Sequence, residues 1–474
     1  MLGNDFRTFL QEVKQKYPSD YVEIDKEVSG QYETTAIVTK LEMQKRTPLL
    51  FFKKVKGTEF PVVVNSCASR TLVAAGLGVS KDALSDKYFH ALNNMIKPVR
   101  VGSGPVQEVI KTGQQADLLQ LPQMTYHDTD IGPYVSGGIV MAKDPDTGVY
   151  NCSYDRLMVK GSHKLGIYMT PGRHLGQIYE KCEYLGKPME VVITLGNHPA
   201  WCMGALFIGQ YAVDERDVMG GLMGKPLEVV PAKTVDLDVP AFAEMVIEGE
   251  IPPFERESEG PYGEFTGYSA GQVDRAFIKI KAITYRKGAI FQDVCGGPHR
   301  ELLLMTTIPM EPSILYFLQS NIPAVQAVRC PAPFTLFVAI RKTREGQAKH
   351  AALTAFTADM QVKHCVVVDH DIDLSDNAAV IRAIATRAQA DRDVFIIKQD
   401  SHDELDPSRN PGVPASDKMA IDATAKPSLS IFASRPKVPK EVMDRIRLED
   451  FVPGAGAAAP KRQREPQPVG SSMA

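Results

Sequence analysis

Two glutamates separated by four residues carry the most suggestive chemistry in this sequence. Glu259 and Glu264 are the first and last residues of the segment EGPYGE. Within it, Pro261 fixes one φ angle, and the two glycines can adopt φ angles that other residues avoid. Such a loop can aim both carboxylates at one point, and a carboxylate pair whose pKa values are pushed apart can carry out acid–base chemistry. Taken alone, the segment is more often an acidic surface turn, because loops are generally exposed and polar.

A second stretch, residues 151–156 with the sequence NCSYDR, adds a basic partner. In a regular strand, the side chains of Asn151 and Ser153 would lie on one face and that of Arg156 on the other. The strand must therefore be distorted before Asn151 and Arg156 can reach the same pocket. Without such a distortion, Arg156 would be a solvated arginine at a strand end.

Asn151, His174 and Glu215 together offer a site for Mn²⁺ or Mg²⁺. Amide, imidazole and carboxylate groups suit these metals. Each residue by itself is more often structural or solvated, since a lone histidine is usually a hydrogen-bonded structural residue. Lys418 lies among small and polar residues and could pair with a phosphate as a compact charge. Spacing alone does not establish that these residues meet.

The composition bounds the class of protein. The chain has 474 residues, 44% of them hydrophobic and 23% charged, which is ordinary for a globular protein with several domains. A net charge of −3 gives no reason to expect nucleic acid or an anionic membrane as partner. The seven scattered cysteines form no CxxC pair, so neither a disulfide framework nor a structural zinc site is indicated. No signal-like segment and no run of about 18 apolar residues stands out, so a cytoplasmic protein is expected.

The elements that must position these residues fall into three segments. The first, residues 1–112, is predicted to be an α/β domain, in which Asp5 can cap an opening helix with one apolar face. Its other predicted elements are strands at 49–52 and 61–64 and helices at 69–78 and 84–95. No glycine-rich dinucleotide fingerprint follows a strand anywhere, so a Rossmann domain is not expected.

The second segment, residues 113–312, is rich in short strands with Gly and Pro between them, which favours a β-barrel or sandwich. Its predicted strands are 138–142, 151–159, 191–195, 275–285 and 289–294. Within 275–285, apolar Ile278 and Ile280 alternate with Lys279 and Lys281, as expected of a half-buried antiparallel strand.

The third segment, residues 313–452, shows the order β-α-β-α-β, which favours a parallel sheet with right-handed crossovers. The predicted elements are a strand at 336–340, a helix at 347–360, a strand at 364–369, a helix at 378–390 and a strand at 394–398. One of residues 375–377 can cap the second helix. Residues 453–474 are Gly, Ala, Pro, Gln and charge, and are predicted to be a disordered tail.

Taken in order, the motifs resemble the UbiD family of reversible decarboxylases, which use prenylated FMN. The resemblance rests on Asn151-x-Ser153-x-x-Arg156, Arg173-His174, Glu215, the segment from Glu259 to Glu264, and Asp417-Lys418-Met419. It extends from about residue 5 to about residue 430. It implies an N-terminal α/β domain, a split β-barrel flavin-binding domain and a C-terminal α/β oligomerisation domain. The pattern had indicated the same three segments.

The resemblance implies how the cofactors would be held. Asn151, His174 and Glu215 would bind a divalent metal, typically Mn²⁺ or else Mg²⁺, and this metal with a nearby K⁺ would bind the flavin phosphate. Ser153 would contact the cofactor and Lys418 its phosphate. The full set implied for cofactor binding is Asn151, Ser153, Arg156, Arg173, His174, Glu215 and Lys418.

The catalytic network implied by the resemblance is Arg156, Glu259 and Glu264. A second buried carboxylate beside the first resists ionising, so Glu264 is expected to be the proton donor, with Glu259 and Arg156 positioning and tuning it. The substrate pocket is expected to include Thr170, Arg173, Phe265, His299 and Ile421. Arg173 stands where some members acting on acrylic acids carry Gln, which leaves the substrate open.

The expected activity is reversible decarboxylation of a small aromatic or heteroaromatic carboxylic acid with release of CO₂. An aryl-acrylic acid, or a prenylated hydroxybenzoate in ubiquinone synthesis, is the alternative substrate. A flavin- or metal-binding scaffold subunit is the alternative without catalysis, and a metal-dependent hydrolase is disfavoured because no HExxH motif occurs. A flavin prenyltransferase would supply the cofactor, and the chain would form a homodimer or a homohexamer.

Overall fold

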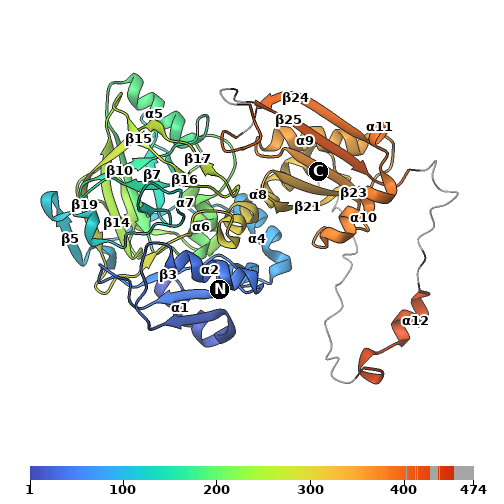
Figure 1. Cartoon of the computed structure of the whole chain (residues 1–474), viewed down its shortest axis with the longest axis horizontal. Helices are drawn as coiled ribbons and strands as arrows, with labels where there is room; N and C mark the ends of the chain where they lie inside the picture. The colour runs from blue at the N-terminus through green and yellow to red at the C-terminus, as the bar shows by residue number, and fades with distance from the viewer. Residues whose placement is uncertain (402, 411–412, 414, 427–435, 437, 453–474) are drawn as a thin grey trace, which may run out of the picture. The chain divides into compact units, whose positions relative to one another are not determined.

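The protein is described here by a computed structural model (Figure 1). The described residues are 1–401, 403–410, 413, 415–426, 436 and 438–452. Residues Met1–Thr424 form one compact unit, to which the whole candidate site belongs. A second unit begins at Ala425 and contains helix α12 (Lys440–Arg445) and the 3₁₀ turn η7 (Leu448–Asp450). The tail predicted at 453–474 lies outside the described residues.

The N-terminal segment contains a four-stranded sheet in the order β1-β2-β3-β20. Its strands are β1 (Tyr21–Ile24), β2 (Leu49–Phe52), β3 (Val62–Val64) and the later β20 (Phe291–Gln292), and its helices are α1 (Phe6–Lys16), α2 (Glu33–Met43), α3 (Arg70–Gly76) and α4 (Leu84–Asn93). As predicted, Asp5 caps α1, because its side chain accepts a hydrogen bond from the Thr8 amide at 2.8 Å. The apolar face of α1 is buried against β2 and β3.

The central segment is built on a curled nine-stranded antiparallel sheet in the order β6-β9-β10-β19-β14-β11-β7-β8, with β5 paired to β19 (Figure 1). The strands are β5 (Val109–Thr112), β6 (Tyr134–Val135), β7 (Ile139–Lys143), β8 (Tyr150–Tyr154), β9 (Leu157–Val159), β10 (Lys164–Ile167), β11 (Met189–Leu195), β14 (Met245–Ile251) and β19 (Phe277–Tyr285). The alternation predicted in β19 is confirmed, since Ile278 and Ile280 are buried while Lys279 is exposed. This half-barrel confirms the expected architecture.

Shorter elements of the central segment surround the half-barrel. The helices are α5 (His174–Tyr184), α6 (Pro199–Ala205) and α7 (Glu215–Met223). The small sheets are β4 (Val99–Arg100) with β12 (Glu228–Pro231) and β13 (Asp238–Pro240), β15 (Glu257–Glu259) with β18 (Val273–Arg275), and β16 (Tyr262–Gly263) with β17 (Ser269–Ala270). These short pairs carry the two glutamates, so the loop between the carboxylates begins and ends on strands.

Two strand predictions in the central segment were wrong. Residues 151–159 do not form one strand, because the chain leaves the ladder at Asp155 and Arg156 and changes partners: β8 pairs with β7, whereas β9 pairs with β6 and β10. The strand predicted at 289–294 is only two residues long and pairs with β3 of the N-terminal sheet. The chain is distorted at Arg156, but the distortion does not bring Asn151 and Arg156 to the same pocket.

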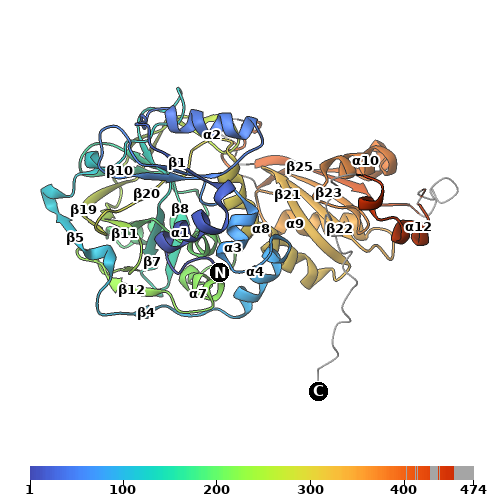
Figure 2. The same ribbon diagram turned by 90° about the horizontal axis from the view of Figure 1, so that it is seen from below.

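The C-terminal segment has a five-stranded sheet in the order β21-β22-β23-β25-β24. Its elements are β21 (Val325–Ala332), β22 (Thr335–Ile340), α9 (Gln347–Ala358), β23 (His364–Asp369), α10 (Asn377–Arg387), α11 (Ala390–Asp393), β24 (Val394–Ser401) and β25 (Ala415–Ala423). Alternate residues of β22 and β23 belong to two different cores, one with α9 and one with α10, so these helices cover opposite faces of the sheet (Figure 2). Asp376 caps α10, as predicted.

The prediction of a parallel sheet was wrong at both edges. Strands β22, β23 and β25 run parallel, but β24 is antiparallel to β25 and β21 is antiparallel to β22. Helix α8 (Arg300–Asn321) was not predicted from the sequence; it contains Pro309 and Pro312 and is buried on several sides. Proline disfavours a helix interior, so the pattern did not indicate one. The boundary expected at residue 312 falls inside α8 and, like the other domain boundaries, stays a prediction.

Helix α8 contacts α4 and α6 as well as β21 and α9, so it lies between the half-barrel and the C-terminal sheet (Figure 2). Among the described residues, no helix is long and apolar enough to cross a membrane. All seven cysteines are free and buried.

Candidate active site

Arg156 lies between the two glutamates of the EGPYGE segment. Its Nε and Nη2 donate to the two carboxylate oxygens of Glu259 at 3.0 and 2.6 Å, and its Nη1 donates to Oε1 of Glu264. The three side chains are almost completely buried, with 9%, 1% and 7% of Arg156, Glu259 and Glu264 exposed. A two-pronged pair of this kind fixes the plane of the guanidinium group. The arrangement leaves Glu264 as the carboxylate held by a single hydrogen bond from Arg156.

The electrostatics of this trio separate the roles of its members. Burial raises the pKa of Glu264 above its ordinary value, although the ion pair with Arg156 opposes the rise. The negative charges of Asp403 and Glu259 add to the increase. Burial alone would lower the pKa of Arg156, but its bonds to the two glutamates outweigh that effect and raise it. Arg156 therefore stays charged, while Glu264 is the acid that keeps a proton more readily than an exposed glutamate.

The backbone of the loop depends on its glycines. Gly260 has a φ of +78°, and a Cβ built there would lie 2.7 Å from the carbonyl oxygen of Gly271. A Cβ on Gly263 would lie 2.4 Å from Nδ1 of His127. A side chain at either position would push the loop away from its neighbours, so the sequence between the glutamates sets where the carboxylates point.

A charged cavity of about 260 Å³ is lined by Arg156 and Glu264 together with Tyr168, Arg275 and Glu404. The ring of Tyr168 contacts two guanidinium groups, with its centroid 4.3 Å from Cζ of Arg156 and 4.9 Å from Cζ of Arg275. The Tyr168 hydroxyl donates to Oε2 of Glu404 at 3.3 Å, and Nη2 of Arg275 lies 3.0 Å from the same oxygen. Because Glu404 follows β24, this chain of contacts connects the C-terminal sheet to Arg156.

A separate cavity of about 230 Å³ contains the three predicted metal ligands. Asn151 comes from β8, and His174 and Glu215 are the first residues of α5 and α7. Nδ1 of His174 lies 4.0 Å from Oε1 of Glu215, and Oε2 of Glu215 accepts the amide of Cys152 at 2.9 Å. The tertiary structure therefore brings together three side chains that are widely separated in the sequence.

The donor set fits a divalent cation. Asn151 is buried, with 6% of it exposed, and its side-chain amide can offer an oxygen ligand beside the imidazole of His174 and the carboxylate of Glu215. Burial raises the pKa of Glu215 to about 8, and a bound cation would reverse this by favouring the carboxylate. Burial and the charge of Arg173 lower the pKa of His174, which keeps the imidazole neutral, as metal binding requires. In the described part of the chain no group of three or more His, Cys, Asp or Glu side chains forms a candidate metal site, so Asn151 is needed to complete this one.

Three more predicted residues, Ser153, Thr170 and Arg173, line the same cavity as the metal set. The hydroxyl of Ser153 donates to Asp155 at 2.6 Å, and Arg173 lies 3.7 Å from Oδ1 of Asp359 in the C-terminal segment. Asn151 and Arg156 border different cavities, so the break in the strand turns Arg156 towards the glutamates and not towards the metal set.

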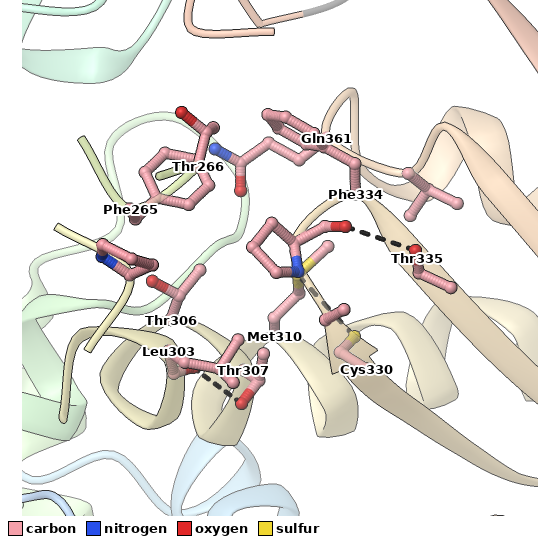
Figure 3. A pocket seen from close by; sticks show the side chains of 14 residues that line it. Phe265, Thr266, Leu303, Thr306, Thr307, Met310, Cys330, Phe334, Thr335 and Gln361 are labelled. Carbon is pink, nitrogen blue, oxygen red and sulfur yellow. Dashed lines mark hydrogen bonds between the residues drawn. The ribbon is translucent and has the colours of Figure 1, made fainter. Parts of the chain in front are cut away.

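Phe265 and His299 lie elsewhere around the site. Phe265 lines an apolar pocket and packs edge-on against Phe334, with ring centroids 5.6 Å apart (Figure 3). His299 is buried: its Nδ1 bonds to Glu42 at 3.0 Å, and its Nε2 has no hydrogen-bond partner among the described residues. His299 lines none of the cavities described in this section, so its expected contact with the substrate stays a prediction.

The structure does not bring Lys418 and Ile421 to these cavities. Both lie on β25, which is paired on both sides within the C-terminal sheet. Lys418 is 1% exposed, and its Nζ is 3.1 Å from Oδ2 of Asp400. Ile421 packs against the core beneath α10. Their expected contacts with phosphate and substrate stay predictions.

Comparisons with known proteins identify the family. Residues 15–92, 97–299 and 303–423 match the N-terminal, Rift-related and C-terminal domains of 3-octaprenyl-4-hydroxybenzoate carboxy-lyase, which define UbiD. Together the matches span most of the chain in the family's own order. The chain belongs to the UbiD family.

Solved UbiD structures share the whole fold. The UbiD-class enzyme HmfF from Pelotomaculum thermopropionicum, solved with FMN, superposes with a TM-score of 0.87 at 37% identity, covering 95% of this chain and 100% of that one. Vanillic acid decarboxylase from Sedimentibacter hydroxybenzoicus in its closed form gives 0.86 at 27% identity, covering 96% and 100%. Gallate decarboxylase from Lactiplantibacillus plantarum is 32% identical over 464 residues, 89% of this chain and 94% of that protein. The family match and these relatives make this chain a carboxy-lyase of the UbiD type.

Another UbiD relative acts on a different kind of acid. Anhydromevalonate phosphate decarboxylase from Methanothermobacter thermautotrophicus is 31% identical over 408 residues, covering 85% of this chain and 93% of that protein. The two sequence relatives differ by only one percentage point in identity, yet one is named for a phosphorylated acid and the other for gallate. Overall identity therefore does not decide which substrate this UbiD enzyme takes.

Several residues of this UbiD site were missed by sequence reasoning. They are Tyr168, Arg275, Glu404, Thr306 and Gln361. None belongs to a motif with fixed spacing, and the last three come from segments far along the chain. Their residue types offer one clue, because an arginine can pack on a tyrosine ring and pair with a glutamate. The sequence does not show which tyrosine, arginine and glutamate come together.

Proposed function

We propose that this enzyme reversibly decarboxylates a small aromatic or heteroaromatic carboxylic acid with prenylated FMN as its cofactor. The observation that carries the proposal is the buried Glu259–Arg156–Glu264 trio, two members of which line a cavity near the metal-type donor set. The names of the solved relatives support the cofactor, since HmfF has been solved with FMN and, in an evolved dimeric form, with prFMN.

Asn151, His174 and Glu215 would bind Mn²⁺ or Mg²⁺ in their shared cavity. This metal, together with K⁺, would hold the phosphate of the cofactor. Ser153 and Arg173 line the same cavity and would contact the cofactor. When bound, prenylated FMN supplies the electron sink that makes loss of CO₂ from an unsaturated carbon feasible.

The protein's own part is to hold the carboxylate and to deliver a proton. Arg156 keeps its charge and would orient the leaving carboxylate, while Glu259 fixes the guanidinium plane from behind through two hydrogen bonds. Oε1 of Glu264 is occupied by Arg156, so the transferable proton belongs on Oε2. Glu264 would give this proton to the carbon that CO₂ has left, and would take it back in the carboxylation direction.

The test is decarboxylation by the loaded enzyme. Protein produced together with a flavin prenyltransferase should show a visible flavin absorption band and should release CO₂ from members of a panel of aromatic acids. Protein produced without the prenyltransferase should bind less chromophore and be nearly inactive. Full turnover by protein shown to be free of flavin would refute the proposal, as would a loaded enzyme that releases CO₂ from no acid of the panel.

The same assay distinguishes two alternatives. An aryl-acrylic acid would require the same trio and would appear as preferred turnover of cinnamate-type substrates. A scaffold subunit would bind flavin and metal without releasing CO₂. The intact trio of Arg156, Glu259 and Glu264 favours catalysis, because a scaffold has no need to bury two carboxylates around one arginine. A homodimer is proposed by analogy with the evolved dimeric form named for HmfF, and a homohexamer is the alternative.

A further inference from the structure

Asp144 lies at the turn between β7 and β8, close to the metal-type donor set. It is a carboxylate with only 2% of its surface exposed, and no step of the proposed mechanism uses it. Its Oδ1 accepts the backbone amides of Asp146 and Thr147 at 2.8 and 3.1 Å, which shapes the turn. Its Oδ2 accepts hydrogen bonds from side chains of other parts of the chain.

Two side chains from distant segments converge on Oδ2 of Asp144. Nζ of Lys181 on α5 donates to it at 2.7 Å, and the hydroxyl of Tyr211, in the loop before α7, donates to it as well. Nζ of Lys181 also lies 4.9 Å from the centroid of the Tyr211 ring. Burial alone would raise the pKa of Asp144, but the hydrogen bonds from Lys181 and Tyr211 outweigh burial and lower it to about 2. These three residues, here named the Asp144 cluster, are therefore held together by a charged carboxylate.

Each of the three segments that meet at this carboxylate also carries one of the metal-type donors. The turn leads directly into β8, of which Asn151 is the second residue. Lys181 follows His174 by seven residues on α5, which is close to two helical turns, so both side chains lie on the same face of that helix. Tyr211 lies four residues before Glu215, the first residue of α7. The cluster thus connects three parts of the chain that must keep a fixed spacing for the donors to meet.

Tyr211 makes the most direct contact between the Asp144 cluster and a donor. Its ring packs edge-on against the imidazole of His174, with centroids 5.3 Å apart and planes at 87°. Asp144 and Tyr211 also line one small cavity together with Asn151 and His174. The volume of this cavity is about 10 Å³, which is at the lower limit for one water molecule. The space is too small for a ligand, so these side chains support the donors and do not bind a molecule of their own.

The loop that carries Tyr211 has a conformation that needs support. Ala212, the next residue, has a φ of +66°, in the left-handed region that side chains rarely adopt. Residues in this region persist where surrounding contacts hold them there. The hydrogen bond from Tyr211 to Asp144 is such a contact. Because Glu215 follows Ala212 by only three residues, relaxation of this loop would disturb the start of α7.

From these contacts we propose that the Asp144 cluster fixes the geometry of the three metal-type donors and thereby sets the affinity of the site for its divalent cation. Its members are positioning residues and not metal ligands, since Oδ2 of Asp144 is occupied by Lys181 and Tyr211. Loss of a group that orients a metal ligand typically costs about 10–100-fold in metal affinity. The proposal rests on the metal site of the proposed function and adds residues that act on that site indirectly.

The test measures the Kd for Mn²⁺ from the EPR signal of free Mn²⁺, using protein stripped of metal and saturated with FMN. Asp144→Asn should raise this Kd by about tenfold or more, because a neutral amide holds Lys181 and Tyr211 less strongly than a carboxylate does. Asp146→Asn is the matched control. Asp146 lies in the same turn and also pairs with Lys181, at 3.1 Å, but its side chain is exposed and Tyr211 donates to Asp144 instead. The control should keep the wild-type Kd, and an equal increase in both variants would overturn the proposal.

A second variant, Tyr211→Phe, keeps the ring against His174 and removes only the hydroxyl. It should raise the Kd for Mn²⁺ by about 2–12-fold, which corresponds to the loss of one hydrogen bond. The thermal stability of each metal-free variant and the EPR line shape of bound Mn²⁺ are measured in parallel, because a change in ligand geometry alters the line shape whereas a merely structural defect lowers stability alone. Tyr211→Phe decides the matter where Asp144→Asn does not fold.

The outcomes separate this proposal from the proposed function. A wild-type Kd and line shape in folded Asp144→Asn and Tyr211→Phe would overturn the role of the cluster alone. Wild-type protein that binds no Mn²⁺ with FMN present would overturn the metal site and, with it, the role of the cluster.

Discussion

Replacing Glu264 by Gln tests the chemistry of the trio with little change of shape. Gln has the same length as Glu, and its carbonyl oxygen can still accept the hydrogen bond from Nη1 of Arg156. Arg156 also keeps its two hydrogen bonds to Glu259. The variant lacks the carboxylic proton on Oε2, and this is the proton expected to be transferred to the substrate carbon.

The structure separates the effect on rate from the effect on stability. Because burial favours the neutral form of Glu264, an uncharged amide is a close substitute, and the free energy of unfolding should change by less than about 1.5 kcal/mol. Loss of a positioned general acid costs about 10²–10⁴-fold in rate. Since each factor of ten is about 1.36 kcal/mol, the barrier should rise by roughly 2.7–5.4 kcal/mol. The expected loss of activity is therefore much larger than any loss of stability.

The assay measures CO₂ release, exchange of the product's ring hydrogen with D₂O, and flavin absorbance. Both rates should fall in parallel, while flavin content is retained. Glu257→Gln is the control, since Glu257 lies on the same strand two residues before Glu259 but pairs with Lys160 and Lys164 at the surface. Near-normal turnover and exchange in Glu264→Gln would remove Glu264 from the mechanism and leave Glu259 as the only carboxylate of the pair able to serve.

The pH dependence follows from the same residue. The pKa of Glu264 is raised, and the protonated form is the donor, so kcat for decarboxylation should be highest below this pKa and should fall as pH rises through it. The falling limb should be absent from the residual activity of Glu264→Gln. A pH profile that is unchanged in the variant would assign the limb to another group.

Three further predictions concern the surroundings of the trio. His174→Ala should lower Mn²⁺ content and flavin retention, measured by elemental analysis and absorbance. His163 lies outside the cavities described above, so His163→Ala should change neither quantity. Glu404→Arg places a second cation beside Arg275 and should lower kcat by about tenfold. Adding Arg275→Glu should restore part of the lost activity. A double variant no more active than Glu404→Arg would show that the pairing of residues 275 and 404 does not matter for catalysis. Phe265→Ala should change relative kcat/KM among ring sizes by about 2–12-fold, as expected for loss of an aromatic contact worth about 0.5–1.5 kcal/mol, and an identical substrate ranking would place the ring elsewhere.

The sequence by itself determined much of the local structure and the identity of the family. The cap at Asp5, the alternation around Ile278 and the helix after Asp376 are set by neighbouring residues, so they can be read from short windows. The EGPYGE segment is only partly of this kind: glycine permits the φ of +78° at Gly260, but the neighbour that excludes a side chain at Gly263 is His127, which is far away in the sequence. The cap, the alternation and the helix start depend on residues that are close together in the sequence.

Only the tertiary structure decided which of these residues meet. Arg156 turns towards the glutamates because β8 and β9 pair with different strands, and no local pattern encodes that exchange of partners. The antiparallel edge strand β24 and the buried helix α8 likewise follow from long-range pairing and packing, which can override local propensity. The charge-free lining beside Phe265 is assembled from four separate stretches of the chain, so its composition exists only once the chain has folded.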